Sequence, residues 1–367
     1  MGLSGGVDSS VAAAIMKEMG HEVSGAIMRI WPGDLCGEGT SRHACYGPSE
    51  ELDVEDAHEV ADRLGIPLFE IDLKQAYKTE VLDYFRTEYL LGRTPNPCVR
   101  CNKRVKFDVL LKQASYSGVN FDFFATGHYV KVKFSRERDR YILSKAVDGK
   151  KDQSYFLYSL SQEQLSRSMF PIGDYSKQQV RDIAAALGLV VSDKAESQDF
   201  ADSGYAHLMG GLTNPGPIIN MQGEVLGLHR GIAYYTVGQR RGLGISSPHP
   251  LYVIAIDHVS NSVVIGSKSE VWAKGLVASG MNWIAINELD RPIHTKTRIR
   301  STHQEASALV TPLAEGMVHV GFEHPQMAVA PGQAVVFYDG DELVGGGTID
   351  IIERCESHEI GCHMVIR

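Results

Sequence analysis

Two adjacent glycines lie in a serine-rich stretch at the start of the chain, in the segment Ser4-Gly5-Gly6-Val7-Asp8-Ser9-Ser10. Glycines let the backbone turn so that several N–H groups face one point, and the serine hydroxyls add donors around the same anion. A helix of small residues is expected over 9–19, and the partial positive charge at its N-terminus would reinforce the site. The spacing differs from that of a Walker loop, which requires Gly-x-x-x-x-Gly-Lys-Ser/Thr. The segment therefore predicts a phosphate-binding loop, with a plain glycine turn before a helix as the alternative.

Up to about residue 190, apolar strands alternate with amphipathic helices, which is typical of a parallel sheet covered on both faces. Strands are expected over 22–28, 67–73 and 121–125. Helices are expected over 9–19, 53–64, 75–90, 103–115 and 177–187, with Asp53 capping the second. A hairpin pattern joins 130–134 to 141–145. These patterns predict an α/β fold with a doubly wound parallel sheet.

Beyond about residue 204 the helical periodicity disappears, and short strands separated by glycine, Asn-Pro and Asp-Gly turns take over, such as 252–256 with 263–265. A break near 272–280 divides this β-rich half. We therefore expect a catalytic domain with a helical extension over 1–203, a small β-rich central domain over 204–272 and a C-terminal β-barrel over 273–367.

The position of the glycine loop conflicts with this sheet. The loop begins at residue 2, whereas a phosphate loop in a doubly wound sheet normally follows a central strand. Either the start codon has been placed too late or the sheet lacks one member. Since losing a buried strand would cost more than marginal stability allows, we favour a misplaced start.

At 367 residues the chain is longer than one hydrophobic core usually covers. No apolar run approaches the roughly 18 residues needed to span a bilayer, and no signal segment is present, so we expect a cytoplasmic protein without membrane contact. We also expect a monomer. Six cysteines in that compartment are thiols, catalytic groups or metal ligands rather than structural disulfides. The net charge of −9 disfavours nucleic acid, but local clusters such as Arg240-Arg241 can still form basic faces.

Two cysteines and several cations lie together in a turn that enters a predicted helix, within residues 92–103. A helix N-terminus and neighbouring Arg or Lys both stabilise a thiolate, and the thiolate is the nucleophile. The pair Cys98-x-x-Cys101 is equally compatible with half of a zinc or iron–sulfur site, or with a redox pair. Residues 126–129 end a predicted strand, where ligands bind in such sheets, whereas 151–155 and 238–244 mix donors with glycines on loops that suit phosphate contacts.

Taken in order, these segments resemble the tRNA-specific 2-thiouridylase family almost from end to end. The matching stretches are 2–10, 92–107, 125–129, 151–157, 196–199, 231–245 and 331–338. The resemblance implies a catalytic domain of the adenine nucleotide alpha hydrolase (pyrophosphatase-loop) type. It also implies an ATP-dependent tRNA 2-thiouridine synthase, a tRNA-uridine 2-sulfurtransferase that adenylates the wobble uridine and releases AMP and pyrophosphate. The sulfur would come from the persulfide of a donor protein, a cysteine desulfurase or a relay protein.

The resemblance also assigns roles to individual residues. Cys101 corresponds to the sulfur-handling nucleophile, and Asp8 would lie near Mg²⁺. The ATP positions are Gly2, Leu3, Ser4, Gly5, Gly6, Val7, Asp8, Ser9, Met28 and Gly127. The tRNA positions are Asn96, Pro97, Cys98, His128, Lys151, Asp152, Gln153, Arg298, Ile299 and Gln333, to which we add Arg240 and Arg241 from the basic cluster. Of these, Asn96, Pro97 and Cys98 would lie beside a target base flipped out of its stack.

This chain departs from the family at one catalytic position. The family commonly has a second cysteine after Ser-Gln-Asp, but here Asp199 is followed by Phe200, Ala201 and Asp202. Cys98 is the expected substitute. Only two residues separate it from Cys101, and a turn that enters a helix can bring the two sulfurs side by side. Alternatively, Cys98 and Cys101 hold an iron–sulfur cluster with a third ligand from Cys36 or Cys45.

Two other functions remain as alternatives. The absent cysteine and the absent strand are compatible with a degenerate, non-catalytic tRNA-binding homologue. A small-molecule adenylating ligase would use the same phosphate loop, but it leaves the cysteine segment and the β-rich half unexplained. Cys355 and Cys362, near the end of the chain, are expected to be structural or incidental.

Overall fold

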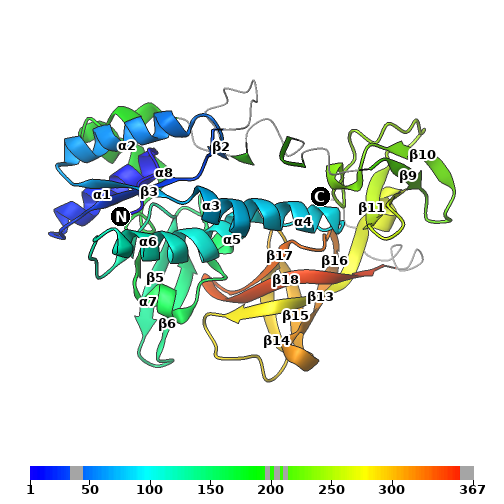
Figure 1. The fold of residues 1–367 in the computed structure, drawn as a ribbon. Coiled ribbons are helices and arrows are strands. Elements are labelled where there is room, and N and C mark those ends of the chain that lie inside the picture. The colour runs from blue at the N-terminus through cyan, green and yellow to red at the C-terminus, as the bar shows by residue number, and fades with distance from the viewer. Residues whose placement is uncertain (34–43, 195–198, 202–206, 210–213, 356–367) are drawn as a thin grey trace. The chain divides into compact units, whose positions relative to one another are not determined.

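The computed structural model describes residues 1–33, 44–194, 199–201, 207–209 and 214–355. These residues belong to two compact units. Unit 1 comprises residues 1–82, 97–207 and 341–343, and unit 2 comprises 83–96, 208–340 and 344–367. Figure 1 shows the helices and strands of both units. Cys36, Glu196 to Gln198 and Cys362, which the sequence analysis singled out, lie outside the described residues.

The parallel sheet of unit 1 is built around the first three residues of the chain. Strand β1 (Gly25–Arg29) pairs in parallel with β3 (Leu68–Asp72), and β4 (Phe124–Ala125) pairs in parallel with β7 (Ser168–Met169). Residues 1–3 connect these two pairs, because the N–H of Gly2 donates to the carbonyl of Ala125 at 2.9 Å and that of Leu3 donates to the carbonyl of Ala26 at 2.9 Å. The central position that we expected to be vacant is therefore filled over this short length.

Three helices of unit 1 share one hydrophobic core with this sheet. They are α1 (Val7–Glu18), α2 (Glu50–Leu64) and α8 (Lys177–Ala186). Leu3 and Ile27 from the sheet are buried against Val11, Val60 and Val180 from the helices. The cap of α2 is Ser49 and not Asp53, so that prediction is wrong: the helix begins at Glu50, which places Asp53 inside its first turn, where its carboxylate accepts from Lys194 at 2.7 Å.

The other two predicted helices are interrupted by π-helical turns. Residues 75–90 form α3 (Lys74–Tyr77), the π-helix η1 (Lys78–Asp83) and α4 (Tyr84–Leu90). Residues 103–115 continue α5 (Pro97–Cys101) as the π-helix η2 (Asn102–Val109) and α6 (Leu110–Tyr116). Of these elements, α4 belongs to unit 2. Unit 1 also contains β2 (Ala44–Tyr46), β5 (Val130–Ser135), β6 (Arg140–Lys145), η3 (Ser154–Leu157), α7 (Gln162–Ser166), η4 (Val190–Asp193) and β8 (Asp199–Ala201). The short turn η5 (His207–Met209) begins at the last residue of unit 1 in this part of the chain and continues into unit 2.

Unit 2 contains two β structures. A four-stranded sheet has the order β10 (Val225–His229), β9 (Gly216–Ile219), β12 (Ser262–Gly266) and β11 (Tyr252–Asp257). The second structure is a barrel in the order β13 (Trp272–Trp283), β16 (Val318–Met327), β15 (Ala306–Pro312), β14 (Ile293–Arg298), β17 (Ala334–Asp339) and β18 (Glu342–Arg354). Pairing of β13 with β18 closes this barrel. Short 3₁₀ turns are η6 (Ile232–Tyr234), η7 (Lys268–Val271) and η8 (Ala314–Gly316).

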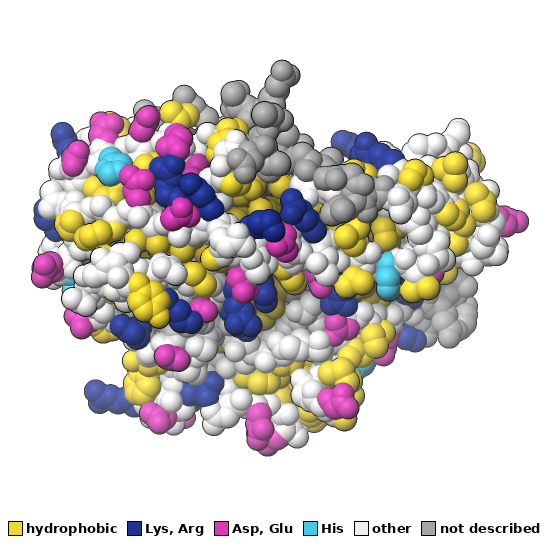
Figure 2. All heavy atoms as spheres, viewed as in Figure 1, with side chains coloured by type: hydrophobic (Ala, Val, Ile, Leu, Met, Phe, Trp, Pro, Cys, Tyr) yellow, Lys and Arg dark blue, Asp and Glu magenta, His cyan; other side chains and the backbone are white. Residues whose placement is uncertain are grey.

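Charged side chains of both signs are intermixed on the face drawn in Figure 2. Among the residues that the structure describes, no helix combines the length and apolarity needed to cross a membrane.

Candidate active site

The glycine loop forms a turn with backbone contacts too close for any other residue. Gly5 has a φ of 63°, and a Cβ on it would lie 2.2 Å from the carbonyl oxygen of Asp53. A Cβ on Gly127, just after β4, would lie 2.6 Å from the nitrogen of Ser9. Gly6 caps α1 without a side-chain hydrogen bond, so no side chain caps the first turn of this helix. The loop thus keeps the backbone donors that an anion requires.

The serines of the loop divide between the turn and the solvent. The Ser9 hydroxyl donates to the carbonyl of Gly6 at 3.1 Å and accepts from the N–H of Ser4 at 3.2 Å. The Ser10 hydroxyl donates to the same carbonyl of Gly6 at 2.8 Å. Ser9 and Ser10 are buried, whereas Ser4 is exposed. The Ser4 hydroxyl lies 3.2 Å from that of Ser9 and is the hydroxyl of the loop on an exposed residue.

Asp8 is held by two residues that the sequence analysis did not assign to the site. Its Oδ1 accepts hydrogen bonds from the Tyr129 hydroxyl at 2.8 Å and from Lys177 Nζ at 2.7 Å. Ser176 and Gln179 form a capping box, which marks Lys177 as the first residue of α8. That signal gives the helix start, but nothing in the sequence relates it to an aspartate 169 residues away.

A second lysine, Lys194, contacts the backbone of the glycine loop. Lys194 Nζ donates to the carbonyl of Gly5 at 2.8 Å and to Asp53 at 2.7 Å, and it also forms an ion pair with Asp56. Burial is the largest influence on the pKa of Asp53 and raises it, while the hydrogen bond from Lys194 opposes that rise. Lys194 therefore connects the loop to α2.

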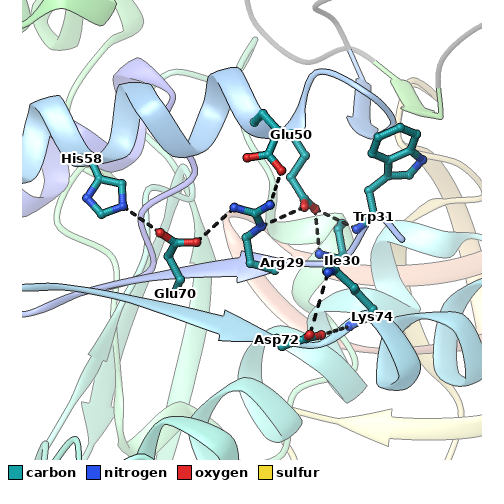
Figure 3. A network of polar contacts seen from close by, with 9 residues as sticks. Arg29, Ile30, Trp31, Glu50, His58, Glu70, Asp72 and Lys74 are labelled. Atoms are coloured by element: carbon teal, nitrogen blue, oxygen red, sulfur yellow. Dashed lines mark hydrogen bonds and ion pairs between the residues drawn. The ribbon is translucent and has the colours of Figure 1, made fainter. Parts of the chain in front are cut away.

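The end of β1 is fixed by a buried carboxylate, as Figure 3 shows. Met28 is half-buried in β1, opposite Ile71. Immediately after the strand, the N–H groups of Ile30 and Trp31 donate to Glu50 Oε1 at 2.7 and 2.9 Å. Because Glu50 is the first residue of α2, the chain leaves β1 and returns to α2 at one point.

The cysteine turn does not favour the thiolate as we expected. Burial raises the pKa of Cys101 to about 11, although the Lys106 cation opposes this. Cys101 is the last residue of α5, and Arg100 is directed to Glu80 in η1, with Nη2 2.7 Å from Oε2. The expectation that neighbouring cations lower this pKa is therefore wrong for Cys101, since removal from water outweighs them.

Three thiols influence the pKa of one buried tyrosine. Tyr77 is 2% exposed and stacks on Tyr46, with ring centroids 5.4 Å apart and an interplanar angle of 12°. Burial, followed by the thiols of Cys101, Cys45 and Cys98, raises the pKa of Tyr77. Within the described ranges, no group of three or more His, Cys, Asp or Glu side chains is arranged to hold a metal ion.

Comparisons with known proteins agree with this geometry. Residues 1–201 match the family model described as tRNA methyl transferase HUP domain, 210–267 the tRNA methyl transferase PRC-barrel domain, and 273–349 the aminomethyltransferase beta-barrel domain. The chain is 46% identical to the tRNA-specific 2-thiouridylase MnmA of Acetivibrio thermocellus, over 95% of this chain and 98% of that protein. It is 44% identical to the protein of that name from Pelotomaculum thermopropionicum, over 95% and 96% of the two chains. The chain belongs to the tRNA-specific 2-thiouridylase family. The predicted fold class is thereby confirmed.

The positions that the thiouridylase resemblance assigns to tRNA in unit 1 are largely engaged within the protein. His128 is 9% exposed, hydrogen-bonds Thr126 at 2.8 Å, and has a pKa far below its usual value because of burial and, secondarily, Lys106. Asp152 accepts from the N–H of Ser154 at 3.2 Å, and Gln153 accepts from the N–H of Tyr129 at 2.9 Å. Lys151, Pro97 and Cys98 are partly exposed.

In unit 2, the corresponding thiouridylase positions differ in exposure. Arg240 and Arg241 are exposed, and Arg240 lines a cavity of about 710 Å³ together with residues 242–251. Arg298 donates to Glu305 at 2.9 Å and lies over the ring of Tyr338. Ile299 is 2% exposed in the barrel core, so a contact from it would have to involve its backbone. Gln333 and Asn96, which also belong to this unit, are both half-buried.

Proposed function

We propose that this chain is an ATP-dependent tRNA 2-thiouridine synthase, which adenylates the wobble uridine and exchanges its O2 for persulfide sulfur. The observation that carries the proposal is the combination, within unit 1, of a glycine loop at the N-terminus of α1 and the cysteine turn of α5. The relatives named tRNA-specific 2-thiouridylase support it, because they match over nearly their whole length. A small-molecule ligase would need the loop but not the thiols.

The glycine loop suits the activation step. Uridine O2 is a poor leaving group, and adenylation turns it into part of AMP. The uncapped first turn of α1 and the Ser4 hydroxyl would bind the departing pyrophosphate. Lys177, which lies against Asp8, would supply positive charge there. Gly127 would keep the backbone after β4 close enough to the loop to shape the nucleotide site.

Among the described residues no ready-made site for a resident metal ion is present, and Cys36, one of the two candidate third ligands of a cluster, lies outside them. No group of three ligands occurs among them, and one Asp8 oxygen already accepts from both Lys177 and Tyr129. Mg²⁺ that arrives with ATP would be held largely by phosphate oxygens, with Asp8 as the protein ligand, and would neutralise charge on the pyrophosphate.

The tRNA side of the proposal rests on exposed cations. Arg240 and Arg241 would bind phosphates, while Pro97 and Cys98 would lie beside the extruded base. A protein persulfide would supply sulfur to the thiols. The division into a catalytic part at 1–203, a central part at 204–272 and a barrel at 273–367, and the monomeric, cytoplasmic state, stay predictions.

The test compares Asp8→Asn with Asp182→Asn, a matched change on α8, where Asp182 accepts only from Gln178 among the contacts described. The purified proteins receive ATP, a wobble-uridine tRNA and a persulfide donor. The parent and Asp182→Asn should release pyrophosphate only with tRNA and give a uridine with sulfur in place of oxygen. Asp8→Asn should lose at least about a hundredfold in pyrophosphate release, because it removes a charge at the site of reaction.

Three outcomes would overturn the proposal. Pyrophosphate release without tRNA would indicate a small-molecule ligase. Binding of tRNA without pyrophosphate release by the parent would indicate a degenerate binding protein. A methyl group on the tRNA without ATP cleavage, in a parallel reaction that also contains a methyl donor, would indicate the methyl transfer named in the description of the family that residues 1–201 match.

A further inference from the structure

The segment that carries Cys45 is anchored beside the phosphate loop. This segment runs from the end of β1 to the start of α2. Its two ends meet where Glu50 accepts hydrogen bonds from the N–H groups of Ile30 and Trp31, as Figure 3 shows. Glu50 is only 7% exposed, and Arg29 also contacts it at 3.2 Å. A buried carboxylate with several charge-assisted partners is a rigid anchor. The segment therefore begins and ends at a defined place in unit 1.

Backbone pairing then places Cys45 next to the position where the family's second cysteine is missing. Strand β2 pairs in parallel with β8, with Ala44 opposite Asp199 and Tyr46 opposite Ala201. Cys45 thus lies in the strand beside the one that contains Ala201. The two segments are far apart in the sequence, so the sequence alone does not relate them.

Packing of Tyr46 directs this strand toward the cysteine turn. Tyr46 is buried and stacks on Tyr77, whose ring lies within electrostatic reach of Cys101, Cys98 and Cys45. Among the influences on the pKa of Cys101, the thiol of Cys45 comes third, after burial and Lys106, and raises it. The stacking of Tyr46 on Tyr77 and the pairing of β2 with β8 therefore bring Cys45 to the part of unit 1 that contains the cysteine turn.

The thiols differ in their access to solvent. Cys45 is exposed, whereas Cys98 and Cys101 are only partly exposed. A donor protein reaches a fully exposed thiol more readily than a partly covered one. This difference assigns them different roles.

We propose that Cys45, and not Cys98, receives the persulfide sulfur, and that Cys101 resolves it. This inference rests on the proposed function. It replaces our sequence-based expectation for Cys98, which lies in the same short helix as Cys101.

The steps balance as follows. The Cys45 thiolate attacks the outer sulfur of the donor persulfide, forming Cys45–S–SH and releasing the donor thiol. The terminal sulfur attacks C2 of the adenylated uridine, and the C2–O bond breaks with AMP leaving. The Cys101 thiolate then attacks Cys45 Sγ, so that the S–S bond breaks, the sulfur stays on C2 and a Cys45–Cys101 disulfide forms. A small external dithiol supplies the two electrons and two protons that restore both thiols.

The experiment uses the whole protein under anaerobic conditions, with ATP, a wobble-uridine tRNA and a persulfide donor but no reductant. After a single turnover, peptide mapping of the parent should show a Cys45–Cys101 disulfide. Cys45→Ser should lose thiolation while releasing pyrophosphate at the parental rate. Cys355→Ser is the matched control, since Cys355 is a thiol of unit 2, and it should keep both activities and the disulfide.

The results separate this inference from the proposed function. If the parent thiolates tRNA but Cys45→Ser does so equally well, or if the disulfide joins Cys98 to Cys101, the inference fails and the proposed function stands. Iron bound stoichiometrically by the three cysteines would also overturn it, because ligands of a cluster cannot form the disulfide. If the parent releases no pyrophosphate with tRNA, the proposed function itself fails.

Discussion

At the scale of single residues, burial outweighs charge at Cys101. The thiol lies beside a cation, Lys106, yet its pKa rises to about 11 because little water reaches it. Its folded pKa exceeds the unfolded value, so the stability gained from the neutral thiol is complete below the ordinary pKa and is lost as pH rises through about 11. A sequence containing three cations within six residues predicts the opposite, because side-chain directions and burial depend on the fold.

This pKa predicts how Cys101 reacts. Its alkylation by iodoacetamide, followed by peptide mass spectrometry, should speed up about tenfold per pH unit up to about pH 11, because only the thiolate reacts. Lys106→Ala should slow alkylation at each pH by raising the pKa further. Lys112→Ala, a change on an exposed side chain paired with Asp108, should leave the rate unchanged. A rate that levels off below pH 9, the usual thiol value, would contradict the burial argument.

At the scale of elements, the Glu50 anchor joins β1 to α2. Glu50→Ala should lower the free energy of unfolding of unit 1 by about 1–3 kcal/mol, because the N–H groups of Ile30 and Trp31 lose a buried acceptor. Glu51→Ala removes the same charge from a side chain that is 63% exposed and should cost less than about 1 kcal/mol. Urea unfolding followed by circular dichroism measures both. Equal losses in the two variants would show that Glu50 acts only through its charge.

The elements also show what apolar periodicity predicts and what it misses. The helices over 53–64 and 177–187 are found nearly as predicted, because their apolar faces repeat with the helical period. The π-helical turns η1 and η2 were not predicted. A π-helical turn has one more residue than an α-helical turn, and the types of residue in it do not reveal this. The loop and the Cys-x-x-Cys pair were found because they are local in sequence. Lys177 was not found, and Cys45 was considered only as a possible cluster ligand, because strand pairing and packing bring both residues to the site.

At the scale of the whole molecule, the net charge of −9 does not prevent an affinity for nucleic acid. Each phosphate contact releases counterions, so tRNA affinity should fall steeply with salt. Arg241→Ala, a change at an exposed position, should reduce the slope of log affinity against log salt by about one. Lys112→Ala removes one charge as well and should leave the slope unchanged. Filter binding across a salt series gives both slopes, and identical slopes would remove Arg241 from the tRNA surface.

Closure of the barrel in unit 2 has a kinetic consequence. The pairing that closes it joins β13, which begins at Trp272, to β18, which ends at Arg354. During synthesis β13 emerges long before its last partner, so its edge stays unpaired until the end of the barrel sequence is available. An unpaired edge can pair with another chain. The same closure that leaves the finished barrel without an exposed edge therefore makes its assembly a late event. Correct folding requires that β18 pair with β13 before the edge of β13 pairs with a second copy of the chain.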